Sequence, residues 1–313
     1  MTHIHVIHEN AAWLEPLAAA LDRQRLPWQD WFFDTGVFDL SGPPPEGVFY
    51  NRMSASSHTR GHRYAAELTA AVLAWLEGHG RKVVNGARAL DLEISKARQH
   101  AALAAAGIRT PETVLVAGAD LLVAAAQSHF GDGPFILKPN RGGKGLGVRL
   151  FRSAGALADY LASPDYEAPV DGLHLVQQYV RSPLPLITRA EFVGGRFFYA
   201  VEVDTSDGFE LCPADACAVG DTLCPAGEVR RAKFTIIDDI DPALKRSYEA
   251  FLAANNIGVA GLEFITDTDG RTYTYDVNTN TNYNPDAEAR AGRSAMDALA
   301  RYLDAELARA GGG

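Results

Sequence analysis

The sequence predicts a mixed α/β protein in which a parallel sheet with helices is followed by antiparallel hairpins. Over the first 85 residues, short apolar runs alternate with helical segments, which is the pattern of a parallel α/β sheet. Farther along, Gly194-Gly195 and Asp269-Gly270 each separate two apolar runs, as expected for hairpin turns. Between these parts, a strand-like segment at 135–139 leads into a loop with four glycines in six residues.

The first part of the chain divides into regular elements at recognisable signals. Asn10 can cap a helix that Pro27 ends, and Gly107 can end an alanine-rich helix. The expected elements are strand 4–7, a helix to about 24, strands 28–33 and 48–50, helix 64–79, strand 82–84 and helix 91–106.

The remaining elements follow from apolar runs between turn signals. They are strand 114–116, helix 119–129, a hairpin around the glycine loop, helix 154–162, strands 173–180, 188–192 and 196–203, helix 242–255, strands 258–266 and 272–277, and a final helix 286–309. The sequence therefore predicts three parts, an N-terminal domain over 1–86 and two α+β subdomains over 87–180 and 181–313.

Composition and charge exclude several classes of protein. The chain has 313 residues, of which 47% are hydrophobic and 22% charged, so it can fold around a large core or two to three smaller ones. The net charge of −10 argues against a general nucleic-acid binder. Neither an apolar run of bilayer length nor a signal-peptide pattern is present, so we expect no membrane partner and a cytoplasmic location.

The three cysteines, Cys212, Cys217 and Cys224, lie within thirteen residues. Their odd number does not describe a disulfide framework. Three thiolates could bind a metal, but their spacing fits no common zinc motif and a fourth ligand is needed. We interpret them as ordinary reduced cysteines in a loop, with a metal site as the alternative.

The glycine-rich loop has the features of a phosphate-binding flap. Glycines allow positive φ and a close approach of the backbone, so that successive N–H groups can surround an anion. Lys138 and Lys144 add positive charge. The loop lacks the Gly-Lys-Ser/Thr end of a P-loop and is followed by another strand. A plain β-hairpin turn is the alternative reading.

The last predicted hairpin carries a candidate metal site. Glu263 lies on its first strand, and Asp276 and Asn278 lie two residues apart on its second, hence on one face. Two carboxylates and an amide oxygen suit Mg²⁺, which completes its shell with water and phosphate oxygens. The alternative is a polar, solvent-facing hairpin.

Three further residues are candidates for substrate contact. Arg52 and Ser54 follow the strand at 48–50, at the sheet edge where α/β proteins bind ligands, and could hold a carboxylate. A structural salt bridge and a helix cap are the alternatives. Asn280 belongs to an alternating Asn/Thr run that can hydrogen-bond a polar ligand or simply form Asx turns.

Together these segments resemble the ATP-grasp superfamily, and within it the RimK-like carboxylate–amine ligases. The resemblance covers about residues 85–290 and rests on several motifs in the family's order. They are Asn85-Gly86 with Ser95-Lys96, Ile136-Leu137-Lys138-Pro139, the loop 141–148, Leu175 to Val180, Thr188-Arg189 with the Gly194-Gly195 hairpin, and Asp276-Val277-Asn278 with Glu263 upstream.

The resemblance implies the ATP-grasp fold, with an N-terminal pre-ATP-grasp domain and two subdomains that clamp ATP. The ATP-binding residues implied are Lys96, Lys138, Arg141, Gly142, Gly143, Lys144, Gly145, Gln178, Tyr179 and Val180. It also implies Mg²⁺, or Mn²⁺, on Glu263, Asp276 and Asn278, and makes Arg189 the catalytic residue.

The activity implied is ATP-dependent amide formation through an acylphosphate, on an amino acid or small peptide, and a homodimer is common among such enzymes. Two features depart from the family pattern: Ile187 stands where an Asp is usual, and the cysteine loop replaces an Asn and a Gly-rich turn. The alternatives are an ATP-grasp kinase, a ligase that modifies a protein tail, and a non-catalytic ATP-binding regulator.

Overall fold

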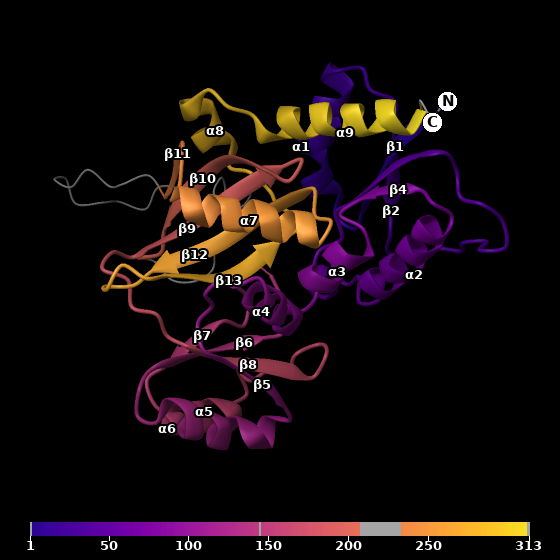
Figure 1. Ribbon diagram of the computed structural model, residues 1–313. Coiled ribbons are helices and arrows are strands. Elements are labelled where there is room, and N and C mark those ends of the chain that lie inside the picture. Colours follow the sequence, from indigo (N-terminus) through magenta and orange to yellow (C-terminus); the bar gives the residue numbers. More distant parts are fainter. Residues whose placement is uncertain (1, 144, 207–232, 312–313) are drawn as a thin grey trace, which may run out of the picture.

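The computed structural model of the protein describes residues 2–143, 145–206 and 233–311. These residues form three sheets that follow one another along the chain (Figure 1). The three cysteines and Lys144 lie outside the described residues, so their predictions stay untested.

The first sheet is parallel throughout, as predicted, with the strand order β2-β1-β3-β4. Its middle strands are buried on both faces because helices pack on each side. The elements are β1 (His3–His8), α1 (Ala11–Arg23), β2 (Trp28–Phe32), β3 (Gly47–Asn51), the short 3₁₀ helix η1 (Ser57–Arg60), α2 (Ala65–Gly78) and β4 (Lys82–Val84).

The second sheet is antiparallel with the order β5-β8-β6-β7, and helices α5 and α6 cover one face (Figure 1). The glycine loop connects β6 to β7. The elements are β5 (Thr113–Ala117), the 3₁₀ helix η2 (Ala119–Leu121), α5 (Leu122–Phe130), β6 (Phe135–Pro139), β7 (Arg149–Phe151), α6 (Ala154–Leu161) and β8 (Leu173–Gln178).

The third sheet is also antiparallel, with the order β11-β10-β9-β12-β13. Alternate residues of β9 and β12, such as Phe192 and Leu262, pack in one core with helix α7. Its elements are β9 (Leu186–Val193), β10 (Arg196–Asp204), β11 (Phe234–Ile237), α7 (Pro242–Ala254), β12 (Val259–Thr266), β13 (Thr272–Asn278) and α8 (Pro285–Ala291).

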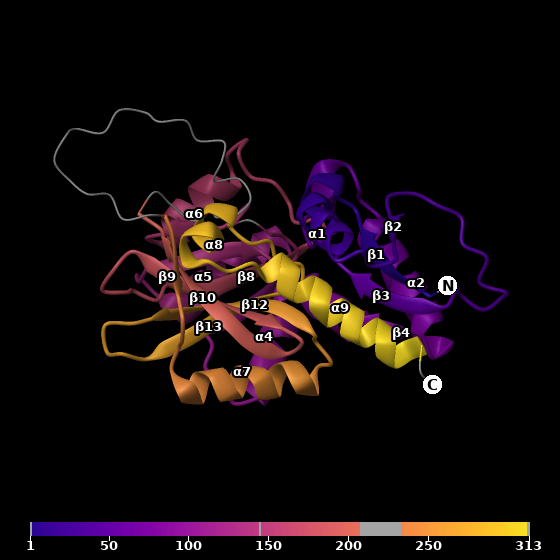
Figure 2. The same cartoon turned by 90° about the horizontal axis from the view of Figure 1, so that it is seen from above.

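Three helices pack against a different sheet from the one expected from their position in the sequence. Helices α3 (Ala87–Glu93) and α4 (Lys96–Ala105) share a core with the third sheet, although they precede the second along the chain. The last helix, α9 (Ala295–Gly311), lies beside α1 and packs against β3 of the first sheet (Figures 1 and 2). The first and third sheets are therefore tied together by helices that lie outside their own stretches of the sequence.

Two predicted helices are each split into two, and one strand was not predicted. The helix expected over 91–106 is interrupted at Ile94, because Ser95 leaves the helix and caps α4 through Arg98 N. The helix expected over 286–309 ends at Gly292, which adopts the left-handed conformation. Strand β11 has only four residues, too few for its apolar run to stand out in the sequence.

Asn85 joins the first sheet to the third through a fully buried side chain. Its Nδ2 donates to Val259 O (2.8 Å) and Thr279 O (2.9 Å), and its Oδ1 accepts from Gly258 N and Val259 N (3.0 and 3.1 Å). Its φ of 57° lies in the left-handed region, which Asn tolerates better than most residues.

Asn85→Gly is expected to lower the free energy of unfolding by about 3–5 kcal/mol, because four buried backbone groups lose their partner. Glycine keeps the backbone conformation, so chemical denaturation measures the loss of the side chain alone. Asn256→Gly is the matched control, since Asn256 has a φ of 52° and no side-chain hydrogen bond among the described residues. Equal stabilities for the two variants would contradict the assignment.

Candidate active site

A cavity of about 210 Å³ opens between the second and third sheets, with residues of the first sheet's edge at one end. The second sheet and its loops contribute Lys138, Gly142, Gly143, Gly145, Gln178, Tyr179 and Val180 to its lining. The remaining predicted residues that line it are Ser54, Lys96, Arg189, Glu263, Asp276, Asn278 and Asn280. Most of the residues predicted from sequence therefore meet in one cavity.

Three of these side chains form a row across the third sheet. Arg189 on β9 stands opposite Glu263 on β12, and Glu263 stands opposite Asp276 on β13. Directly opposite residues on adjacent strands project from the same face of a sheet. The register of the strands thus brings a guanidinium and two carboxylates together at the cavity wall.

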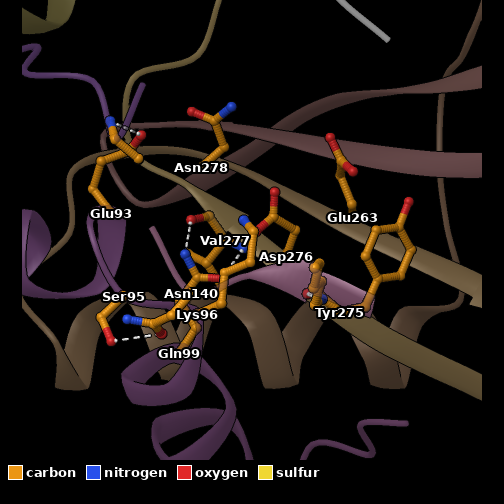
Figure 3. A network of polar contacts seen from close by, with 12 residues as sticks. Glu93, Ser95, Lys96, Gln99, Asn140, Glu263, Tyr275, Asp276, Val277 and Asn278 are labelled. Carbon is orange, nitrogen blue, oxygen red and sulfur yellow. Dashed lines mark hydrogen bonds and ion pairs between the residues drawn. The ribbon is translucent and has the colours of Figure 1, made fainter. Parts of the chain in front are cut away.

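Lys96 and Lys138 bring positive charge to the carboxylate end of this row. Lys96 Nζ donates to Asp276 Oδ1 at 2.7 Å (Figure 3). Burial acts to raise the pKa of Asp276, but the two lysines outweigh it and hold the pKa below its usual value. Burial also acts to lower the pKa of Lys96, but Asp276 raises it above the usual range. Both partners therefore stay charged.

The carboxylates fit a divalent cation. Burial, and then the neighbouring Asp276 charge, raise the pKa of Glu263, so the two acids repel each other in the absence of a cation. Asn278 lines the same cavity as both acids, although its Oδ1 also accepts from Asn280 N at 3.0 Å. In the described parts of the chain, no three His, Cys, Asp or Glu side chains gather as a metal site. Two carboxylates and an amide oxygen are the kind of oxygen ligands that would suit Mg²⁺, and their role as ligands stays a prediction.

A buried network fixes the position of Lys96 at the start of α4. Asn140 Oδ1 accepts from Ser95 Oγ (3.1 Å) and Ala97 N (2.9 Å), and Asn140 O accepts from Lys96 N (3.1 Å). Gln99, one turn later, bonds both backbone groups of Val277, beside Asp276 (Figure 3). These hydrogen bonds fix the positions of the second and third sheets relative to each other around the cavity.

Glu93 is a buried residue of the site that the sequence did not single out. Its Oε1 accepts from Ala55 N (3.3 Å), and its Oε2 accepts from Thr279 N (2.7 Å). Burial raises the pKa of this carboxyl group. Glu93 therefore joins the segment after β3 to the segment after β13, and no spacing pattern in the sequence marks it for that role.

The glycine loop packs tightly under the cavity. A Cβ on Gly142 would lie 3.1 Å from the Pro139 ring, and a Cβ on Gly143 would lie 3.4 Å from Ser56 Oγ. Gly145 and Gly147 have φ values of 75° and 73°. The Gly143 distance is an ordinary contact, whereas a side chain at Gly142 would crowd Pro139 and one at Gly145 or Gly147 would strain the backbone, which agrees with a loop that surrounds an anion.

Arg189 is held from behind by an unpredicted buried acid, Glu191. Arg189 Nε lies 2.7 Å from Glu191 Oε1, and Nη2 donates to Thr281 Oγ1, which in turn donates to Glu191 Oε2 at 2.9 Å. A Cβ on Gly261 would come within 2.5 Å of Arg189 Nε, so only glycine leaves room for this pair. Burial raises the pKa of Glu191 to about 7. Glu191 lies two residues after Arg189 on the same strand, and this spacing is the signal from which their contact could have been predicted.

Two predicted residues do not line the cavity. Arg141 is buried, and its Nη1 donates to Glu67 Oε1 of α2 at 2.8 Å. Arg52 is buried beneath Asn280 and Asn282, to which its guanidinium donates. Their roles in binding ATP and substrate remain predictions, whereas Ser54 and Asn280 do reach the cavity.

Comparisons with known proteins point to one fold. No family model matches the chain. A curated relative, the D-alanine–D-alanine ligase of a Caulobacter species, is 33% identical over 127 residues. That match spans 40% of this chain and only 38% of the relative.

In the described parts of the chain, no helix has the length and apolar character needed to cross a bilayer.

The solved structures that match over nearly the whole chain include two ATP-grasp proteins. The ATP-grasp ligase PsnB in complex with a minimal precursor, Mg and ADP is 17% identical, covers 97% of each chain and has a TM-score of 0.64. The RimK domain ATP-grasp protein from Sphaerobacter thermophilus is also 17% identical, with 96% of this chain and 99% of that chain covered and a TM-score of 0.64.

Proposed function

Since the chain has the ATP-grasp fold predicted from its sequence, we propose that it is an ATP-dependent carboxylate–amine ligase of the RimK-like type. The observation that carries the proposal is the row of Arg189, Glu263 and Asp276, with Lys96 and Lys138 at its end. Such a site brings metal ligands, phosphate-binding cations and an oxyanion donor into one cavity.

Each group has a role in joining an acid to an amine. Lys96, Lys138 and the glycine-loop amides bind the ATP phosphates, and the backbone of Gln178–Val180 contacts adenine. Mg²⁺ held by Glu263, Asp276 and Asn278 would offset charge during phosphoryl transfer, and Mn²⁺ is the expected substitute.

The substrate carboxylate takes the γ-phosphoryl group to form an acylphosphate, and an amine displaces phosphate. Arg189 donates to the oxyanion that develops in that second step. The glycine loop excludes water from the acylphosphate.

An amino acid or small peptide is the proposed substrate class. At the substrate end, Trp13, Ser54, Asn280 and Asn282 line the cavity with neutral polar groups beside Arg189. The relatives named above, a D-alanine–D-alanine ligase and a ligase bound to a precursor, support this class. A cytoplasmic location, a homodimer and the lack of a nucleic-acid or membrane partner remain predictions.

The decisive experiment is release of ADP and phosphate with Mg²⁺ and ATP against a matrix of amino acids and dipeptides, followed by mass spectrometry. ADP release that needs two co-substrates, with a product lighter by one water than their sum, is the expected result. A phosphorylated product from a single co-substrate would replace the ligase by a kinase. ATP binding with no turnover on any acid–amine pair would favour the regulator.

Lys138 gives nucleotide binding a defined pH dependence. Burial and the adjacent Lys96 charge lower the pKa of Lys138 to about 7. Bound phosphates favour the charged lysine, so binding above that pH takes up a proton and ATP affinity should fall as pH rises, by at most about tenfold per pH unit. Calorimetry in two buffers of different ionisation enthalpy counts the proton.

Lys138→Met is expected to weaken ATP binding by about tenfold or more and to remove the proton uptake. Lys245→Met serves as control, because Lys245 lies on α7 and pairs with Asp239 at the surface. Unchanged affinity and proton uptake in Lys138→Met would contradict the nucleotide role.

A further inference from the structure

Arg52 is a buried cation whose partners are all neutral. Only 2% of the residue is exposed. Its Nη1 donates to Trp13 O at 2.9 Å, its Nε to Asn280 Oδ1 at 3.3 Å, and its Nη2 to Asn282 Oδ1 at 2.9 Å and Thr281 O at 3.4 Å. Among the described residues, no carboxylate forms an ion pair with it.

A buried charge without a counter-ion is costly, and folded proteins normally pair such groups. The N–H groups of Arg52 are satisfied by donating to carbonyl oxygens, but its net positive charge remains uncompensated. The cavity begins on the other side of Asn280 and Asn282, both of which line it. An anion bound there would lie close enough to balance the charge of Arg52.

Arg52 also determines which way the two amides face. A guanidinium group donates hydrogen bonds and accepts none, so the atoms of Asn280 and Asn282 that face it must be the oxygens. Each amide therefore turns its NH₂ group away from Arg52. Neither Nδ2 donates a hydrogen bond to any described residue, so both donors are available at the cavity.

We propose that the Nδ2 groups of Asn280 and Asn282 hold the carboxylate of the acid substrate, and that Arg52 acts behind them as a positioning residue and counter-charge. Arg189 lies next to this position, since its Nη2 is 3.4 Å from Asn282 O. The inference rests on the proposed ligase function for the identity of the anion. It replaces direct contact between Arg52 and substrate by contact through two amides.

The test uses Asn280→Asp, which keeps an oxygen facing Arg52 and even adds an ion pair, but removes the donor on the cavity side. Acetate is the probe, with acetamide as its neutral counterpart, and binding is followed by NMR of the ¹³C-labelled compounds. The probes are used at about 100 mM, a concentration that saturates a site with a millimolar Kd. Wild-type protein is expected to bind acetate but not acetamide. Asn280→Asp should weaken acetate binding by about tenfold or more, without a fall in Tm.

Asn282→Asp should behave in the same way, and Gln127→Glu is the matched control, because it adds the same charge at an exposed position on α5. Acetate binding that is unchanged in both Asp variants, or absent in wild-type protein, would overturn the proposal. A purely structural role for the asparagines predicts altered Tm with unaltered acetate binding, which would also overturn it.

The two proposals fail separately. The protein could bind acetate in a way that depends on Asn280 and yet join no acid to an amine. That result would contradict the ligase function and support the carboxylate site. Conversely, the protein could form amides while Asn280→Asp leaves the KM for the acid unchanged. That result would support the ligase function and contradict the carboxylate site.

Discussion

Asp276→Asn is expected to reduce amide-forming turnover by about a thousandfold or more, because it removes charge from the proposed metal site at the step in which phosphoryl transfer needs it. The same carboxylate pairs with Lys96 at 2.7 Å, so the substitution also releases one phosphate-binding cation from its position. ADP release under saturating ATP, with Mg²⁺ varied over a wide range, measures the loss.

The control is Asp269→Asn, at the exposed turn of the same β12–β13 hairpin, which should retain wild-type turnover. The Tm of Asp276→Asn should stay close to that of wild-type protein, since the side chain is partly exposed and its replacement is nearly isosteric. Full activity of Asp276→Asn at ordinary Mg²⁺ concentrations would remove Asp276 from the metal site.

Loss of the Arg189 guanidinium is expected to lower kcat by about a hundredfold to a thousandfold while the KM for ATP changes little. In the proposed mechanism Arg189 acts on charge that develops during the reaction, and it lies at the far end of the row from the lysines. Arg189→Met alone would leave Glu191 buried without its cation, which costs stability.

The informative variant is therefore the double substitution Arg189→Met with Glu191→Gln, which removes both charges and keeps the volumes similar. The single variant Glu191→Gln is its reference, because it retains the guanidinium and the contact with Thr281. A rise in the KM for ATP with kcat preserved would reassign Arg189 to nucleotide positioning.

The sequence predicted those parts of the fold that local signals specify. Gly194-Gly195 and Asp269-Gly270 predicted hairpins that the antiparallel pairing of the third sheet confirms. Helix breaks were missed where one residue outweighs the surrounding helical propensity, as with the Ser95 cap and the left-handed Gly292. The packing of α9 on the first sheet had no local signal, since it depends on contacts between distant segments.

The site could be predicted where a motif has a fixed spacing and not where residues act by packing. Asp276 and Asn278 were found because a strand places alternate residues on one face. Glu93 contacts only partners that the fold brings to it, so nothing in its local sequence marks it. Asn282 belongs to the alternating Asn/Thr run, but its contact with Arg52 depends on the fold. Arg52 was found as a charge at a strand end, but its burial beneath two amides depends on the segment after β13.

The packing of α9 against α1 and β3 has a consequence for how the chain acquires its structure. Leu299, Leu303 and Leu307 of α9 belong to the same core as Ile4 and Leu17. These contacts close a very long loop of the described chain, so the entropy cost of closing it must be met before this face of the first sheet is fully covered. During synthesis the N-terminal strands leave the ribosome before α9 does, so their core is complete only after α9 has been made.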